Sequence, residues 1–74
     1  MAEEYNPIGL SPREIEICHL ICEGMLTKQI AKQLKISDRT VELHRYNVNT
    51  KLKAKHIVDV INYTRNHLIK DSNG

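Results

Sequence analysis

The sequence contains no phenylalanine and no tryptophan, and its only aromatic residues are three tyrosines. A hydrophobic core in this chain must therefore be aliphatic, and aliphatic cores of this size are typical of helical bundles. The sequence also lacks any apolar run near the ~18 residues that a membrane span requires. Residues 1–10 have neither the basic start nor the apolar centre of a signal peptide. We therefore expect a soluble, cytoplasmic protein with no membrane partner.

Cysteine is nearly absent, with only Cys18 and Cys22 in the chain. They lie one helical turn apart, where a disulfide would need distorted geometry, so we expect two free thiols in a reducing compartment. With the adjacent His19 they do not complete a tetrahedral metal site, because no Cys-x-x-Cys pair and no second histidine cluster accompanies them. We therefore predict no metal site. His44, a single histidine beside an apolar helical stripe, is typical of a packed core position.

Glycine is also scarce, and the three glycines do not form a loop that could surround a phosphate group. The sequence shows no nucleophile next to a general base and no carboxylate pair in a recognisable cleft. A chain of 74 residues buries only ~60% of its unfolded surface, which leaves little room for a deep catalytic cleft. We therefore expect one small domain that is not an enzyme and binds no cofactor.

Capping signals and hydrophobic periodicity predict four helices and hence an all-α domain. Ser11 and Glu14 form a capping box at the start of the first helix, and Gly24 ends it. Ser37 caps the third helix, Thr27 replaces the missing cap of the second, and the fourth has no obvious capping residue. The expected helices span residues 12–22, 27 or 28 to 34, 38 to about 53, and about 57 to 68. The corresponding domain limits are a flexible arm at 1–9, a helical domain at 10–69 and a frayed tail at 70–74.

The third predicted helix has one apolar face and one mixed face. At ~100° per residue, Val41, Val48 and Leu52 point in nearly one direction, which must face the core. The opposite face carries Arg39, Glu42, Leu43, Tyr46, Thr50 and Lys53. A leucine and a tyrosine on an otherwise polar face indicate that this face contacts a partner.

Positive charge is concentrated in the middle of the chain, although the net charge is only +2. Residues 26–55 contain eight lysines and arginines against two acidic residues, a net charge of +6, whereas the rest of the chain has three basic and seven acidic residues, a net charge of −4. Lysines on a helix often do no more than solvate its surface, but clustering of this kind favours a partner. Two short helices joined by a tight turn within a basic segment fit a helix-turn-helix that places its second helix in the DNA major groove.

Several segments carry a family resemblance. Leu-Ser-Pro-Arg-Glu at 10–14, Gly24 and Lys-Gln-Ile-Ala at 28–31 follow in order, and residues 36–52 read Ile-Ser-x-x-Thr-Val-x-x-His-x-x-Asn-Val-x-x-Lys-Leu. From residue 10 to about 64, the chain resembles the LuxR/GerE-type helix-turn-helix, the DNA-binding domain of many bacterial transcription regulators. It departs from the family pattern at Leu26, where Ser or Thr usually caps the second helix, and at Lys53, where glycine is usual.

The resemblance implies a tetrahelical bundle whose third helix, about residues 38–53, enters the major groove. The predicted base-reading residues are Glu42, Leu43, Tyr46 and Arg45. The predicted contacts to the DNA backbone are Thr27, Lys28, Arg39, Thr40, Asn47 and Lys51. Glu42 can accept a hydrogen bond from a cytosine amino group, or act by repelling guanine and phosphate oxygens. Leu43 can pack on a thymine methyl group, and Tyr46 can reach a base edge or a phosphate.

The fourth predicted helix has an apolar stripe and a second edge. One is an inward stripe of Ile57, Val60, Ile61, Thr64 and Leu68, and the other contains Val58, Asn62, Arg65 and Ile69. We interpret the second edge as half of a two-fold interface, so the expected partners are double-stranded DNA and a second copy of the chain. The alternative is a helix-turn-helix domain that uses Leu43 and Tyr46 to bind another regulator. The length allows either a complete small regulator or the end of a longer protein with a receiver or sensor domain upstream.

Overall fold

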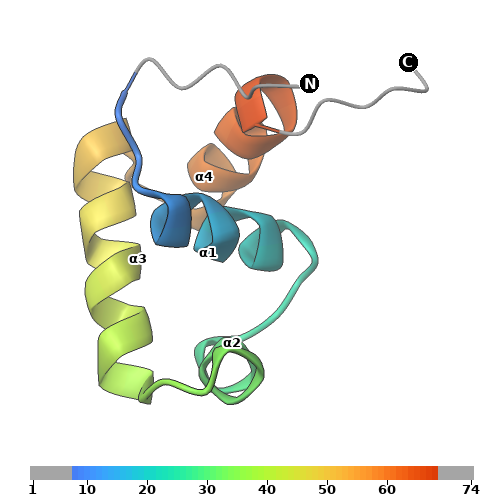
Figure 1. The fold of residues 1–74 in the computed structure, drawn as a ribbon. Coiled ribbons are helices and arrows are strands. Elements are labelled where there is room, and N and C mark those ends of the chain that lie inside the picture. The colour runs from blue at the N-terminus through green and yellow to red at the C-terminus, as the bar shows by residue number, and fades with distance from the viewer. Residues whose placement is uncertain (1–7, 69–74) are drawn as a thin grey trace.

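The computed structural model describes residues 8–68, which form helices joined by short turns and contain no strand (Figure 1). The elements are α1 (Pro12–Cys22), α2 (Thr27–Leu34), α3 (Asp38–Leu52), α4 (Ile57–Tyr63) and η1 (Thr64–Leu68), a π-helical continuation of α4. The predicted all-α, four-helix fold is confirmed. The domain limits stay a prediction, since most of the arm and the whole tail lie outside the described residues.

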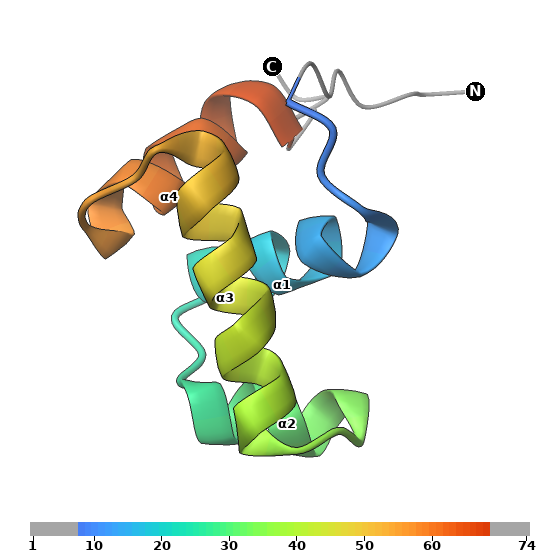
Figure 2. The ribbon, with the colours of Figure 1, turned by 90° about the vertical axis from the view of Figure 1, so that its left-hand side faces the viewer.

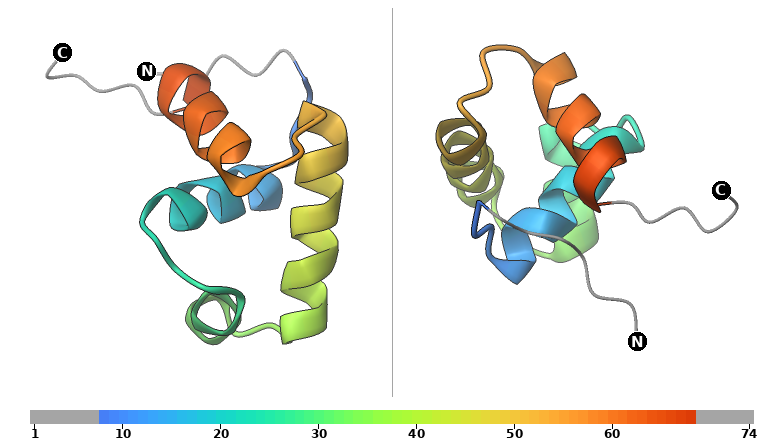
Figure 3. Two further views of the ribbon diagram at one scale, coloured as in Figure 1. Left: turned by 180° about the vertical axis from the view of Figure 1, so that it is seen from behind. Right: turned by 90° about the horizontal axis from the view of Figure 1, so that it is seen from above.

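Helix α3 runs along one side of the bundle, and the other helices pack against its inner face (Figures 1 and 2). Helix α1 crosses α3, while α2 lies beside the first turn of α3 and α4 beside its last turn. Figure 3 shows the segment formed by α4 and η1 packed on α1, beside the end of α3. This arrangement leaves the outer side of α3 uncovered by any other helix of residues 8–68 (Figure 2).

The core is aliphatic, as the absence of phenylalanine and tryptophan predicts. Its buried members are Leu10, Ile17, Cys18, Leu20, Ile21, Ile30, Ala31, Val41, Val48, Val60 and Leu68. Val41 and Val48 are fully buried and Leu52 packs against the core, so the predicted inner face of α3 is confirmed. Both cysteines are free thiols, as predicted. Burial raises the pKa of the Cys18 thiol to about 11, so this thiol stays protonated at neutral pH.

The turn between α2 and α3 is held by backbone and side-chain caps at both ends. Lys35 adopts a left-handed conformation with φ of 60°, and the N–H of Ile36 donates to the Ala31 carbonyl, which closes the end of α2. Ser37 Oγ accepts from the N–H of Thr40 at 3.0 Å, as the sequence predicts. These contacts fix the first turn of α3 relative to α2.

Helix α2 begins at one of the two predicted positions, but its cap differs from the prediction. The N-cap residue is Leu26 and the helix begins at Thr27, so Thr27 does not cap it. Leucine has no side-chain acceptor, and the only side-chain contact at this cap among the described residues comes from Gln29, whose Oε1 accepts from the N–H of Leu26 at 2.8 Å. The Leu26 side chain is 69% exposed.

The start of α4 is capped by Asp59, which the sequence reasoning overlooked. One carboxylate oxygen of Asp59 accepts from the N–H groups of Lys55 and His56, at 3.0 and 3.1 Å. These hydrogen bonds lower the pKa of Asp59 below its ordinary value. Ile57, predicted to belong to the inward stripe, is instead 53% exposed, because it is the first residue of α4 and the buried side of this helix begins only at Val60.

The helix that starts at Ile57 continues to Leu68, as predicted, but changes to π-helical geometry at Thr64. Thr64 is fully buried, and its hydroxyl donates to the Val60 carbonyl at 2.7 Å, so this buried polar group is satisfied. Val60, Thr64 and Leu68 all face the core despite the change of pitch.

The end of α3 suggests a stabilising substitution. Lys53 has φ of 56° and ψ of 39°, a left-handed conformation that costs a residue with a side chain ~1–2 kcal/mol. Glycine avoids this cost but gains entropy in the unfolded chain, so Lys53→Gly is expected to raise the free energy of unfolding by about 0.5–1 kcal/mol. Urea denaturation measures the change. The matched control, Lys32→Gly within α2, should lower stability by about 1 kcal/mol, and a loss of stability in both variants would contradict the account of Lys53.

Candidate nucleic-acid interface

Three of the four residues predicted to read bases, Glu42, Leu43 and Tyr46, are exposed on α3. Tyr46 is 66% exposed and Leu43 58% exposed, and Arg39 and Glu42 are exposed beside them. Three further predicted contact residues are half-buried at the margins of this face: Thr40, Arg45 and Asn47. The exposure that periodicity predicts for this face is confirmed. Exposed large apolar side chains grouped on one face are typical of a contact surface.

Glu42 lies among arginines without pairing to them. Arg39 precedes it by three residues and Arg45 follows it by three, both within helical contact distance. Within residues 8–68 neither arginine forms an ion pair with Glu42. The carboxylate is therefore free to accept a hydrogen bond from a partner, and both guanidinium groups are free to bind anions.

Helix α2 adds positive charge next to the start of α3. Lys28 and Lys32 line an open hollow of about 460 Å³ with Asp38, which belongs to the first turn of α3. Lys28 is exposed and Thr27 is half-buried, so both predicted backbone-contacting residues of α2 lie at the surface. The cationic groups of α2 therefore lie beside the first turn of the exposed helix.

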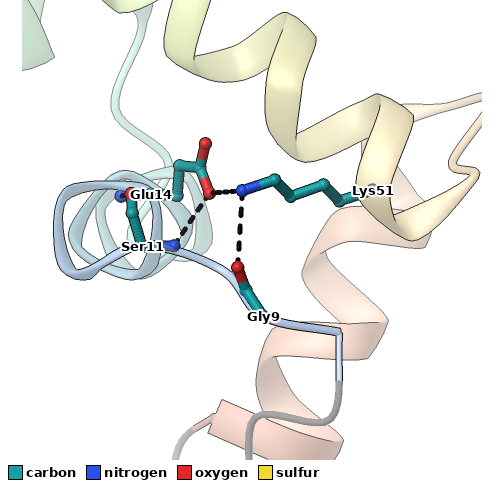
Figure 4. A network of polar contacts seen from close by, with 4 residues as sticks. All are labelled: Gly9, Ser11, Glu14 and Lys51. Atoms are coloured by element: carbon teal, nitrogen blue, oxygen red, sulfur yellow. Dashed lines mark hydrogen bonds and ion pairs between the residues drawn. The ribbon is translucent and has the colours of Figure 1, made fainter.

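Lys51, which the resemblance assigns to the DNA backbone, extends toward the start of α1 (Figure 4). Its Nζ donates to Glu14 Oε1 at 2.7 Å and lies 3.4 Å from the Gly9 carbonyl oxygen. The same Glu14 oxygen accepts from the N–H of Ser11 at 2.8 Å, and Ser11 Oγ accepts from the N–H of Glu14 at 3.1 Å. The predicted capping box is thus formed, and one of its carboxylate oxygens also joins α1 to α3.

Glu14 is ionised although it is only 5% exposed. Burial raises the pKa of this carboxyl, but the hydrogen bonds from Lys51 and Ser11 together outweigh burial and hold the pKa below its ordinary value of 4.5. Sequence periodicity gives no sign of the pair, because Glu14 and Lys51 are 37 residues apart and lie on different helices. The nearest signal is the capping box, which places Glu14 but does not identify its second partner.

The outer edge of α4 is exposed at the positions predicted to form a dimer interface. Val58 is 51% exposed next to Ile57, and Asn62 and Arg65 are also exposed. Ile69, the fourth predicted member, lies outside the described residues. Ile57 and Val58 are two adjacent exposed β-branched side chains, and they make an apolar patch at the start of α4.

None of the helices between residues 8 and 68 is long and apolar enough to cross a membrane. Over the same range, no three side chains among His, Cys, Asp and Glu are grouped so that they could hold a metal ion. The outer face of α3, with the cationic edge of α2, is the candidate functional site because exposed apolar side chains lie there beside exposed cations.

Comparison with known proteins points to one family. The family described as "Bacterial regulatory proteins, luxR family" (GerE) matches residues 9–64. The response regulator protein TodT of Pseudomonas putida is 40% identical over 72 residues, which cover 97% of this chain and 30% of that protein. The Fimbriae Z protein of Salmonella typhimurium is 35% identical over 63 residues, which cover 85% of this chain and 30% of that protein.

A solved structure with a similar fold is also that of a response regulator. The response regulator ChrA of a heme-sensing two-component system superposes with a TM-score of 0.74 and 34% sequence identity, covering 78% of this chain and 29% of the other. The chain thus spans less than a third of the length of each of these three relatives. The family consists of DNA-binding transcription regulators. The match over residues 9–64 and the shared fold show that the chain belongs to the luxR family of bacterial regulatory proteins.

Proposed function

We propose that this domain binds double-stranded DNA sequence-specifically, with α3 in the major groove. The observation that carries the proposal is the uncovered outer face of α3, where Leu43 and Tyr46 are exposed among cationic residues. An α-helix fits the major groove, where each base pair presents a distinct pattern of donors, acceptors and methyl groups. The proposed base-reading residues are Glu42, Leu43, Tyr46 and Arg45. The proposed contacts to the DNA backbone are Thr27, Lys28, Arg39, Thr40 and Asn47.

The chemistry of the outer face favours particular bases. The unpaired carboxylate of Glu42 can accept from a cytosine amino group, and it disfavours guanine, whose major-groove edge holds only acceptors. Leu43 offers an apolar surface that suits a thymine methyl group. Glu42, Leu43 and Tyr46 are not cations. The affinity for DNA therefore depends strongly on phosphate contacts by Lys28 and Arg39.

The proposed assembly is a homodimer formed through α4, with Val58, Asn62 and Arg65 at the interface. The exposed apolar patch on α4 supports this assignment. A two-fold dimer reads two half-sites and gains affinity because the second binding event becomes intramolecular. In the whole protein we propose a receiver domain upstream of this one and a location in the bacterial cytoplasm, where the DNA is.

A second candidate is binding of another regulator through the same face. The observation that favours it is the acidic residue, Glu42, in the middle of a face that also exposes Leu43 and Tyr46. An apolar protein contact responds little to salt, whereas binding to phosphates weakens steeply. Salt dependence therefore distinguishes the two functions.

The test is fluorescence anisotropy of a labelled random duplex titrated with this chain between about 50 and 200 mM salt, with protein up to ~100 µM to reach non-specific affinities. Three or more phosphate contacts predict a plot of log affinity against log salt with a slope of about −2.7 or steeper. Absence of binding at the lowest salt would overturn the proposal and favour the protein partner.

A further inference from the structure

We propose that Lys51 is a positioning residue. It connects the end of α3 to the start of α1 and to the backbone of Gly9, and it does not itself contact DNA phosphates. This inference rests on the proposed function, because it concerns how the DNA-binding face is held in place. It departs from the role that the family resemblance assigns to Lys51. The two roles predict opposite results for the same substitutions.

The geometry around the Lys51 ammonium supports the positioning role. Two of its three N–H donors have acceptors inside the domain, at the Glu14 carboxylate and the Gly9 carbonyl (Figure 4). The Glu14 side chain is 6% exposed, against 37% for Lys51. A phosphate contact would pull the ammonium away from a buried carboxylate and leave that charge without a cation. The free-energy cost of leaving a buried carboxylate unpaired exceeds the free energy gained from an ion pair exposed to water.

The position of Lys51 on α3 determines what it holds. Val41 and Val48 anchor the middle of the helix in the core, and Lys51 lies in its last turn. The lysine therefore restrains the end of a rigid helix whose exposed side chains include Tyr46, five residues earlier. Glu14 Oε1 accepts from the N–H of Ser11, which caps α1, and from Lys51 Nζ. This one oxygen atom therefore holds the end of α3 next to the start of α1.

Glu14→Gln gives the sharpest test, because glutamine retains an acceptor for the N–H of Ser11 while it removes the charge. If Lys51 contacted phosphate, removal of the competing carboxylate would free the ammonium, strengthen DNA binding and steepen the salt slope by up to about 0.9. If Lys51 is a positioning residue, Glu14→Gln should weaken binding, although it removes a negative charge from a DNA-binding protein. Lys51→Met should have the same effect, and Lys28→Met, a surface control, should make the slope shallower by about 0.9.

The experiment measures the affinity of each variant for the duplex that the wild-type chain binds most tightly, at several salt concentrations and at low temperature, where circular dichroism shows that the variant is folded. We expect Glu14→Gln and Lys51→Met to weaken binding by a similar factor, about three- to tenfold, with an unchanged slope. Tighter binding in Glu14→Gln, or a shallower slope in Lys51→Met, would overturn the proposal. Unchanged affinity of the folded variants would also overturn it, since a pair that only stabilised the fold would give that result.

A second measurement uses the wild-type chain alone, in case the variants do not fold. Amine acetylation followed by mass spectrometry reports the accessibility of each lysine with and without DNA. Lys28 should become protected when duplex is added, whereas the reactivity of Lys51 should be low in the free protein and unchanged by DNA. Protection of Lys51 by DNA would overturn the positioning role alone. A wild-type chain that bound no duplex would overturn the proposed function, and this inference with it.

Discussion

Replacement of Lys51 by methionine is expected to lower the free energy of unfolding by about 2–3 kcal/mol. Methionine keeps most of the aliphatic stem but removes the cation, so the buried Glu14 loses the partner that lies 2.7 Å away. A fully buried charge left unpaired costs ~3–5 kcal/mol. The expected value is smaller because the Lys51 side chain is 37% exposed, so water can approach the vacated site.

Urea denaturation at pH 7 measures this loss, with Lys32→Met on the surface of α2 as the control that should change stability by less than about 0.5 kcal/mol. The pH dependence supplies a second check. The pKa of Glu14 in the folded protein lies below 4.5, so its ionised form stabilises the protein above that pH, and the contribution is lost as the pH falls through the folded-state pKa. The stability gap between wild type and Lys51→Met should therefore narrow in acid. A gap that stayed constant down to about pH 3 would show that Glu14 is not the cause.

Replacement of Tyr46 by alanine is expected to weaken binding to the preferred duplex by about 1–3 kcal/mol, with little effect on a random duplex. The side chain is 66% exposed, so its removal should leave the melting curve unchanged and the loss should come from the contact with DNA. Fluorescence anisotropy on both duplexes measures the difference. Tyr46→Phe separates the hydroxyl from the ring, because it removes only the hydrogen bond.

The control for Tyr46→Ala is Lys28→Met on α2, which should weaken both duplexes alike because phosphate contacts carry no sequence information. Equal losses on both duplexes in Tyr46→Ala would contradict its role as a base-reading residue. If Tyr46→Ala lowered the free energy of unfolding by as much as it weakened DNA binding, the side chain would stabilise the fold and would not act at the DNA.

Much of the fold could be predicted because its determinants are local. The capping residues Ser11 and Ser37 mark two helix starts, and both caps are confirmed. The helical period separates Val41 and Val48, which are buried, from Leu43, which is exposed. The outer face of α3 follows from the same period, so the candidate site could be located without any knowledge of its neighbours.

The features that could not be predicted depend on contacts between distant segments or on the limits of the core. The partner of Lys51 lies 37 residues earlier, and only the crossing of α1 and α3 brings the two together. Ile57 has the spacing of a core residue, but the buried side of α4 begins only at Val60, so Ile57 is exposed. The left-handed conformation of Lys53 agrees with the glycine that the resemblance places at this position, although the lysine itself gives no sign of it.

The central claim is that the outer face of α3 binds DNA, and NMR titration tests it most directly. Backbone amide shifts of the isotope-labelled chain would be followed as an unlabelled duplex is added at low salt. We predict that the largest shifts occur in the first half of α3, from Arg39 to Tyr46, and at the start of α2 near Lys28, with small shifts at the exposed Glu16 on α1. Shifts concentrated on α4, or no shifts at saturating duplex, would contradict the account.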